Sequence, residues 1–183
     1  MPHALYQPLL VASATIASVL TGCQLSLSYV SVAAILSAPD APEYTALTMW
    51  KTTFNRGFYL CPLQAMLCSA IFAVNSIVTL VYGDASMPGH KGFLPLLIGG
   101  IISISLVPYT LVTIVPLEET LLERHGSLSR ELNQGAKNDK VHGDTAGVAA
   151  AIQTRAIMRK WISLNYVRTL IPALTVVWAW TMC

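Results

Sequence analysis

Residues 93–115 read FLPLLIGGIISISLVPYTLVTIV, an apolar run without a charged side chain. About 20 apolar residues in a helix are enough to cross the hydrocarbon core of a bilayer. Three further apolar segments occupy residues 9–36, 58–82 and 165–182, and the last is only just long enough to span. This pattern predicts four membrane-spanning helices.

The composition supports a membrane protein. The chain has 183 residues, of which 54% are hydrophobic and only 11% charged, whereas about a quarter of the residues in a soluble domain are charged. We therefore predict an all-α, integral membrane four-helix bundle that forms one domain over residues 1–183, with a partly helical loop between the third and fourth spans. A net charge of +2 without a basic run or zinc-finger spacing excludes nucleic acid and leaves the lipid bilayer as the expected partner.

Basic residues predict the orientation. Nine of them lie in the loops that follow the first and third spans, against Lys91 alone on the other side. These nine are Lys51, Arg56, Arg124, Arg130, Lys137, Lys140, Arg155, Arg159 and Lys160. By the positive-inside rule, both loops are expected to be cytoplasmic and both termini non-cytoplasmic. No basic residue precedes the first apolar run, so we interpret that run as a retained span rather than a secretory signal.

The sequence contains no motif for thiol redox chemistry, metal binding or nucleotide binding. The four cysteines form no C-x-x-C pair, and the histidines lack metal-ligand spacing. No glycine-rich phosphate loop or dinucleotide fingerprint is present. We therefore expect neither a metal nor an organic cofactor.

The segments between the spans are also predictable in outline. Residues 44–54, which include Trp50, are expected to form a short segment at the membrane interface, a level that tryptophan favours. Residues 83–92 are expected to form a short polar turn. Residues 133–143 are expected to form an exposed linker, after which residues 144–145 cap a helix that continues into the fourth span. Within the spans, small residues at four-residue spacing predict close helix packing in the first span, as do two adjacent glycines in the third; they are Ala14, Ser18, Gly22, Gly99 and Gly100.

Arg168 lies within the fourth span, and an ionisable residue there is a functional-site hypothesis by default. Trp161, Asn165 and Arg168 are spaced i, i+4 and i+7, which places them on one helix face. Such a stripe suits a flat aromatic ligand with phenolic or enolate oxygens. The alternative is structural: an interfacial tryptophan, an asparagine that bonds another helix, and an arginine paired with Glu118. Both interpretations stay open on spacing alone.

Other polar residues gather toward the cytoplasmic half of the bundle, where helical proteins often build ligand sites. Besides the stripe they include Gln24, Tyr29, Arg56, Tyr109, Thr110, Glu118 and Glu119. Glu118 is a candidate to neutralise Arg168 or to act as a base. A pair of solvated charges at a helix end is an equally good interpretation of Glu118 and Glu119.

Three motifs together point to a family. Residues 161–168 match a W-x-x-x-N-x-x-R signature at the entry of the last span, and residues 108–110, followed by Pro116, resemble a P-[FY]-T…P motif in the third span. Residues 21–22 supply an early Thr-Gly. The chain thus resembles fungal anthrone-oxygenase-type four-span membrane proteins. It departs from them at residues 116–119, which read Pro-Leu-Glu-Glu where the family has a Pro-Thr-Asn-Asn-like run, so its substrate is open.

The resemblance implies a membrane-bound oxygenase that converts an anthrone to an anthraquinone with molecular oxygen and without flavin, haem or metal. It implies a flat apolar aromatic substrate, polyketide-pathway enzymes as partners, and the endoplasmic reticulum or a related endomembrane as location. In this role Arg168 and Asn165 would stabilise negative charge, and Glu118 or Tyr109 would be the base. Substrate contacts are expected from Trp161, Thr110, Gln24, Tyr29 and Arg56. The alternatives are another tailoring enzyme on the same scaffold and a non-catalytic membrane protein that binds a hydrophobic intermediate.

Overall fold

The computed structural model describes residues 3–38, 40–82, 92–135 and 145–182. Every regular element within these ranges is a helix, which confirms the all-α prediction. In chain order the elements are α1 (His3–Leu25), the π-helical segment η1 (Ser26–Val32), α2 (Ala33–Leu36), α3 (Glu43–Tyr82), α4 (Phe93–Ile104), α5 (Leu106–Tyr109), the π-helical segment η3 (Thr110–Ile114), α6 (Val115–Gly135) and α7 (Thr145–Met182).

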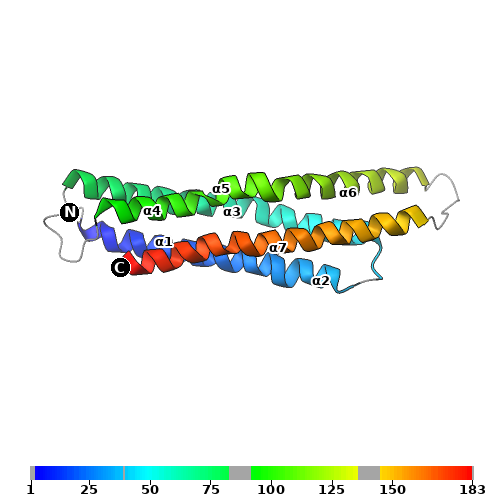
Figure 1. Ribbon diagram of the computed structural model, residues 1–183, viewed down its shortest axis with the longest axis horizontal. Coiled ribbons are helices and arrows are strands. Elements are labelled where there is room, and N and C mark those ends of the chain that lie inside the picture. The colour runs from blue at the N-terminus through cyan, green and yellow to red at the C-terminus, as the bar shows by residue number, and fades with distance from the viewer. Residues whose placement is uncertain (1–2, 39, 83–91, 136–144, 183) are drawn as a thin grey trace.

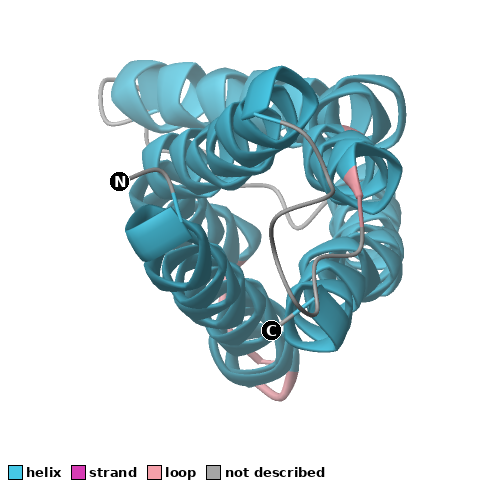
Figure 2. Cartoon of the chain, turned by 90° about the vertical axis from the view of Figure 1, so that its left-hand side faces the viewer, coloured by secondary structure: helices cyan, strands magenta, loops and turns pink. Residues whose placement is uncertain are grey.

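These elements form four long columns: α1 to α2, then α3, then α4 to α6, then α7. Consecutive columns run in opposite directions, and α1 begins at the end of the bundle where α7 finishes (Figure 1). The view along the bundle shows the columns arranged side by side around a common centre (Figure 2). The α1 helix packs mainly on α7 and α3, and α3 packs on α4.

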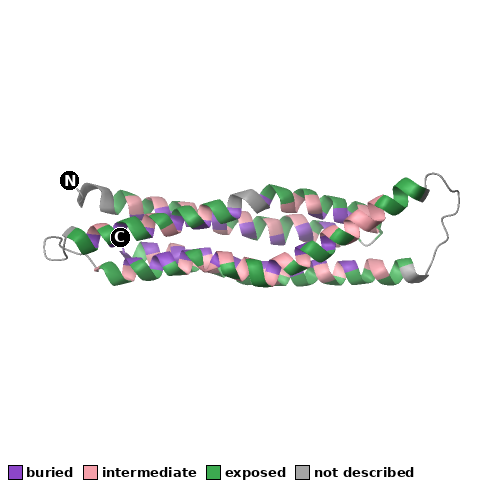
Figure 3. Ribbon diagram, turned by 90° about the horizontal axis from the view of Figure 1, so that it is seen from above, coloured by how far each residue is buried: buried purple, intermediate pink, exposed green. Residues whose placement is uncertain are grey.

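Four helices in the described ranges are long and apolar enough to cross a membrane, which agrees with the predicted number of spans. They cover Gln7–Leu36, Glu43–Val81, Phe93–Gln134 and Gly147–Met182. Their outer surface is apolar: Leu80 is 65% exposed and Val112 76%. The buried residues lie mainly on the inner faces (Figure 3). This is the surface of a bundle that packs its inside tightly and faces lipid on the outside.

The helices are longer than the predicted spans. The α3 helix has 40 residues, which corresponds to about 60 Å of helix, whereas the hydrocarbon core is about 30 Å thick. The bundle therefore continues beyond the apolar segments on the side of the first and third connections. There Arg124 on α6 donates two hydrogen bonds of 2.9 Å to Glu43 at the start of α3.

Residues 44–54 were expected to form a short interfacial segment with Trp50 at the membrane surface, and this was wrong. They continue without interruption into α3, and Trp50 is fully buried. The reason is that α6 and α7 extend alongside and cover it. The resulting apolar cluster contains Val32, Ile35, Ala46, Leu47, Trp50, Ile114, Leu121, Met158 and Trp161.

Small residues let the third column pack closely on α3, as expected for Gly99 and Gly100. A Cβ atom at Gly99 would lie 2.7 Å from the ring of Phe72, so this glycine lets α4 approach α3 closely. The spacing of Ala14, Ser18 and Gly22 suggested a similar stripe in the first span. Only Ala14 is buried. Ser18 and Gly22 are exposed, so that prediction was wrong for two of the three residues.

Some sequence predictions fall outside the described residues. The expected turn at 83–92 lies there except for Gly92, and so does most of the expected linker at 133–143. Residues 133–135 still belong to α6. The helix that was expected to start near residues 144–145 begins in the structure at Thr145.

Candidate functional site

Both π-helical segments border the same cavity, and proline explains one of them. Pro116 has no N–H group to bond the carbonyl of Val112, which lies in η3, so the α-helical ladder is broken there. Pro108 has the same effect on Ile104, where α4 ends. Short π-helical segments in α-helices are frequent at functional sites. The two prolines therefore interrupt the backbone hydrogen bonds of the third column where it lines the cavity.

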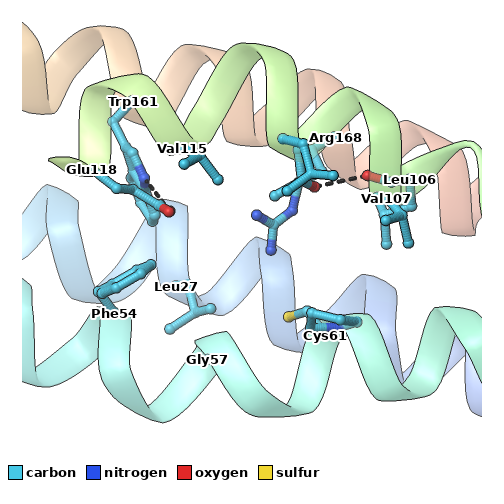
Figure 4. Close-up of a pocket in the computed structure, with 13 residues that line it drawn as sticks. Leu27, Phe54, Gly57, Cys61, Leu106, Val107, Val115, Glu118, Trp161 and Arg168 are labelled. Atoms are coloured by element: carbon cyan, nitrogen blue, oxygen red, sulfur yellow. Dashed lines mark hydrogen bonds between the residues drawn. The ribbon is translucent and has the colours of Figure 1, made fainter.

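The cavity lies between α3, the third column and α7 and has a volume of about 160 Å³. Its polar groups stand at opposite ends, Glu118 and Trp161 at one end and Arg168 with Cys61 at the other (Figure 4). Its wall is otherwise almost entirely apolar. The lining residues are Leu27, Phe54, Gly57, Cys61, Pro62, Leu106, Val107, Thr110, Leu111, Val115, Glu118, Trp161 and Arg168.

Aromatic rings surround the Glu118 end. Trp161 Nε1 donates a hydrogen bond of 3.1 Å to Glu118 Oε1, and Glu118 is only 4% exposed. The Trp161 ring meets Trp50 edge-on, with centroids 6.2 Å apart. Trp50 in turn stacks on Phe54 at 5.3 Å. This end therefore offers a flat aromatic surface beside a buried carboxyl group.

Arg168 supplies the cation at the other end. The residue is 7% exposed, and its guanidinium extends toward the side of the cavity that Leu27 and Cys61 occupy (Figure 4). Its Nε atom is buried and has no hydrogen-bond partner. Cys61 lines the same end of the cavity. A buried guanidinium with an unused donor is suited to bind a negatively charged oxygen atom.

No direct ion pair joins Arg168 to Glu118. Within the described residues, the salt bridge that forms is between Arg124 and Glu43, at 2.9 Å. The structural alternative, in which Arg168 pairs directly with Glu118, is therefore wrong. The hydrogen-bond donor to Glu118 is Trp161, not Arg168.

Asn165 ties α7 to the first column instead of lining the cavity. Its Nδ2 atom donates to Ser28 Oγ at 2.5 Å and to the Gln24 carbonyl at 3.4 Å. Ser28 lies in η1, so this contact braces the π-helical segment. Asn165 Oδ1 and both polar atoms of the Gln24 side chain are buried without a partner. Gln24, Ser28 and Asn165 thus form a polar layer beside Arg168, and some of its hydrogen-bonding atoms have no partner.

Tyr109 bonds a neighbouring helix, whereas Thr110 lines the cavity. The Tyr109 hydroxyl donates to the Leu164 carbonyl at 3.0 Å, which links the third column to α7. Thr110 lines the cavity, and its hydroxyl donates to the Leu106 carbonyl at 2.7 Å. Of these two candidates, the structure brings only Thr110 into the cavity wall.

Tyr29 and Arg56 lie outside the cavity. Tyr29 is 70% exposed. Arg56 is exposed and lines a separate, open groove of about 440 Å³ between α1 and α3. The residues of this groove are Val19, Gly22, Cys23, Ser26, Leu27, Arg56, Gly57 and Cys61. Glu119, the neighbour of Glu118, is also exposed and takes no part in the cavity.

Sequence reasoning missed two parts of the site. The aromatic wall of Trp50 and Phe54 was assigned to the membrane surface, although both residues lie on the helix face that leads to Gly57 and Cys61. The π-helical segments were not predicted either. Pro108 and Pro116 were a usable signal for the irregular third column, whereas η1 contains no proline.

The arrangement favours chemistry on a flat apolar molecule. An aromatic wall can hold its rings, a buried carboxyl group can accept a proton, and a fixed guanidinium can stabilise the resulting anion. Groups of three His, Cys, Asp or Glu side chains placed to hold a metal are absent from the described ranges.

Comparison with known proteins supplies the family. The family model described as anthrone oxygenase matches residues 50–178, from the buried Trp50 to Trp178 near the end of α7. No curated protein and no solved structure matches the chain significantly. The match covers Glu118, Trp161 and Arg168 and well over half of the sequence. The chain therefore belongs to the anthrone oxygenase family.

Proposed function

We propose that this protein is a membrane-bound oxygenase that converts an anthrone-type aromatic polyketide to the corresponding anthraquinone with molecular oxygen. Membership of the anthrone oxygenase family suggests an oxygenase. The observation that carries the specific proposal is the cavity itself, in which Glu118 and Arg168 stand at opposite ends of an apolar space.

Binding comes first in this proposal. The rings of the substrate lie against Trp161 and Phe54, which belong to the cavity wall, and its oxygen atom points to Arg168. Holding the substrate in one orientation lowers the entropic part of the barrier. Thr110 contributes a polar group to the same wall.

Proton removal is the second step. The methylene group of an anthrone is acidic because its anion is an aromatic phenolate. Glu118 accepts one proton from this carbon, and Arg168 stabilises the negative charge that develops on the oxygen. Tyr109 and Asn165 act as positioning residues here, because their hydrogen bonds go to Leu164 and to Ser28.

Oxygen then reacts with the anion. One electron passes from the anion to oxygen, the two radicals combine to a carbon–oxygen bond, and a proton completes the hydroperoxide. Loss of water from the hydroperoxide, by removal of the remaining carbon-bound hydrogen and cleavage of the oxygen–oxygen bond, gives the quinone carbonyl. One oxygen molecule is consumed and one water molecule is formed for each anthraquinone.

No metal, flavin or haem takes part in the proposed reaction, since the electrons come from the substrate anion. The four apolar helices fit a multi-pass membrane protein. We further propose an endomembrane location, with both termini non-cytoplasmic and the cavity near the cytoplasmic leaflet. Polyketide-pathway enzymes would supply the apolar substrate there.

The test is turnover by the purified full-length protein in lipid nanodiscs. Addition of a synthetic anthrone under oxygen should give the anthraquinone with equimolar oxygen uptake, above the spontaneous rate measured with empty nanodiscs. Metal and absorption analysis of the same sample should show no stoichiometric metal, flavin or haem. Binding without turnover would favour a non-catalytic carrier, and a different product would indicate another tailoring reaction. Loss of activity on chelation, restored by one metal, would refute the cofactor-free reaction.

A further inference from the structure

The cavity and the outer groove are neighbouring spaces with a shared wall. Leu27, Gly57 and Cys61 line both of them. The cavity lies inside the bundle, and the groove opens on its surface between α1 and α3. The shared wall therefore consists of the side chains of Leu27 and Cys61 together with the backbone of Gly57.

Size suggests that the two spaces serve one ligand. The cavity measures about 160 Å³, whereas sites for small molecules usually offer about 300–1,000 Å³. The groove adds about 440 Å³. The cavity alone is thus smaller than most such sites, whereas the cavity and the groove together fall within this range.

Leu27 is the movable part of the separating wall. A Cβ atom at Gly57 would lie 2.6 Å from Leu27 Cδ1, so the leucine rests directly on the glycine of α3. Leu27 lies in η1, where the helix is irregular. Rotation of this one side chain would connect the cavity and the groove without any displacement of a helix.

Arg56 gives the groove a chemical preference. It is exposed at the rim of the groove. Among the described residues, its side chain makes neither a hydrogen bond nor an ion pair. The remaining groove residues carry no charge. An aromatic molecule that extends from the cavity into the groove would therefore bring its outer end to a lone cation.

We infer that the groove is the outer half of the substrate site, and that Arg56 binds a carboxylate carried on the outer ring of the substrate. This inference rests on the proposed function for the identity of the ring system. One substrate molecule would then contact two arginines. Arg168 would bind the oxygen atom at the reacting end, and Arg56 would bind the carboxylate at the other end. The preferred substrate is then an anthrone with an acidic substituent rather than a neutral one.

The test is equilibrium binding, which needs no turnover. Full-length protein in phosphatidylcholine nanodiscs is titrated with anthraquinone-2-carboxylate and with its neutral match, anthraquinone-2-carboxamide, and tryptophan fluorescence reports binding. The wild type should bind the carboxylate about fivefold more tightly, the scale of a partly exposed charge pair. Arg56→Gln should remove this preference. Arg159→Gln, a change of another exposed basic residue, should keep it.

Two outcomes would overturn the inference: equal affinity of the wild type for both ligands, or a preference that survives in Arg56→Gln, including the case in which that variant binds both ligands more weakly by the same factor. The last result would mean that Arg56 affects the site as a whole rather than the carboxylate. Leu27→Trp should weaken the binding of both ligands by the same factor, because the larger side chain would fill the space between the cavity and the groove. Turnover of anthrones without a carboxylate preference would leave the proposed function intact and reject this inference alone.

Discussion

Trp161 on α7 donates a hydrogen bond of 3.1 Å to the buried carboxyl group of Glu118 on α6. This contact joins the third and fourth columns at one end of the cavity. The donor is a neutral indole, and among the residues that the structure describes no cationic side chain forms an ion pair with this carboxyl group. A buried carboxyl group fixed in this way is well placed to exchange a proton with a bound substrate.

Glu118→Gln should abolish most turnover and leave the fold intact. Glutamine keeps an oxygen atom for the Trp161 hydrogen bond but cannot accept the substrate proton. General bases contribute about 10²–10⁴-fold to a rate, so kcat should fall by a factor in that range. Oxygen uptake measures the effect, and a thermal melt checks the fold. Glu119→Gln is the matched control, because that neighbouring carboxylate is exposed. Equal losses in both variants would contradict the assignment of Glu118 as the base.

Much of the fold was readable from hydrophobicity alone. Four apolar runs separated by polar segments predict four helices, because a bilayer admits only segments that satisfy their own backbone hydrogen bonds. What could not be read was how far the helices continue outside the membrane. Trp50 is an example: its local sequence fits an interfacial position, and only its packing against Trp161 in the folded bundle shows that it is buried.

The candidate site was predicted in part for a similar reason. Helical spacing correctly put Trp161, Asn165 and Arg168 on one side of α7, but that face is broad enough to meet two different neighbours. Asn165 meets η1, whereas Trp161 and Arg168 reach the cavity. Spacing along one helix carries no information about which neighbour each side chain meets.

Asn165→Ala should reduce stability more than chemistry. Its hydrogen bonds go to Ser28 and to the Gln24 carbonyl, and side-chain hydrogen bonds between membrane helices contribute about 0.6 kcal/mol on average. The thermal midpoint in detergent should therefore fall, while kcat for each folded molecule should stay within about threefold of the wild type. A normal midpoint with a large loss of kcat would instead place Asn165 at the reacting atoms.

Arg124→Gln should loosen the part of the bundle beyond the apolar spans. Glu43 receives hydrogen bonds from Arg124 and from Thr154, so α3, α6 and α7 meet at this one carboxylate. In a double-mutant cycle with Glu43→Gln, the coupling should be about 1 kcal/mol, the upper end for partly exposed pairs. Arg130→Gln is the control, since Arg130 is exposed and, within the described ranges, its side chain bonds a backbone carbonyl on its own helix. Zero coupling would mean that the pair does not stabilise the fold.

The orientation prediction can be tested with sealed microsomes whose cytoplasmic side faces outward. The nine basic residues on one side against one on the other predict that residues 133–143 are cytoplasmic. Added protease should therefore cut the chain there in intact vesicles, and epitope tags on both termini should stay protected until detergent is added. Protection of the 133–143 segment in intact vesicles would reverse the proposed topology.

Arg168→Leu should abolish turnover in a protein that still inserts and folds. Loss of one donor to a developing oxyanion typically lowers a rate by about 10²–10³-fold, and Arg168 has an unused buried donor atom at the cavity. Arg168→Lys should also be slow, because a point charge does not replace a planar fork of donors. Initial rates for each folded molecule, corrected for spontaneous oxidation, measure both effects.

The double variant Arg168→Leu with Glu118→Leu separates catalysis from structure. If the two residues only stabilised each other, each single change would leave a buried charge unpaired, and the double change would restore both thermal stability and activity. Trp161 rather than Arg168 bonds Glu118, so we expect little rescue of stability and none of activity. A double variant that is folded but inactive supports the catalytic assignment of both residues. Recovery of activity would reject it, because such a protein would oxidise the substrate with neither a base nor an oxyanion donor at the cavity.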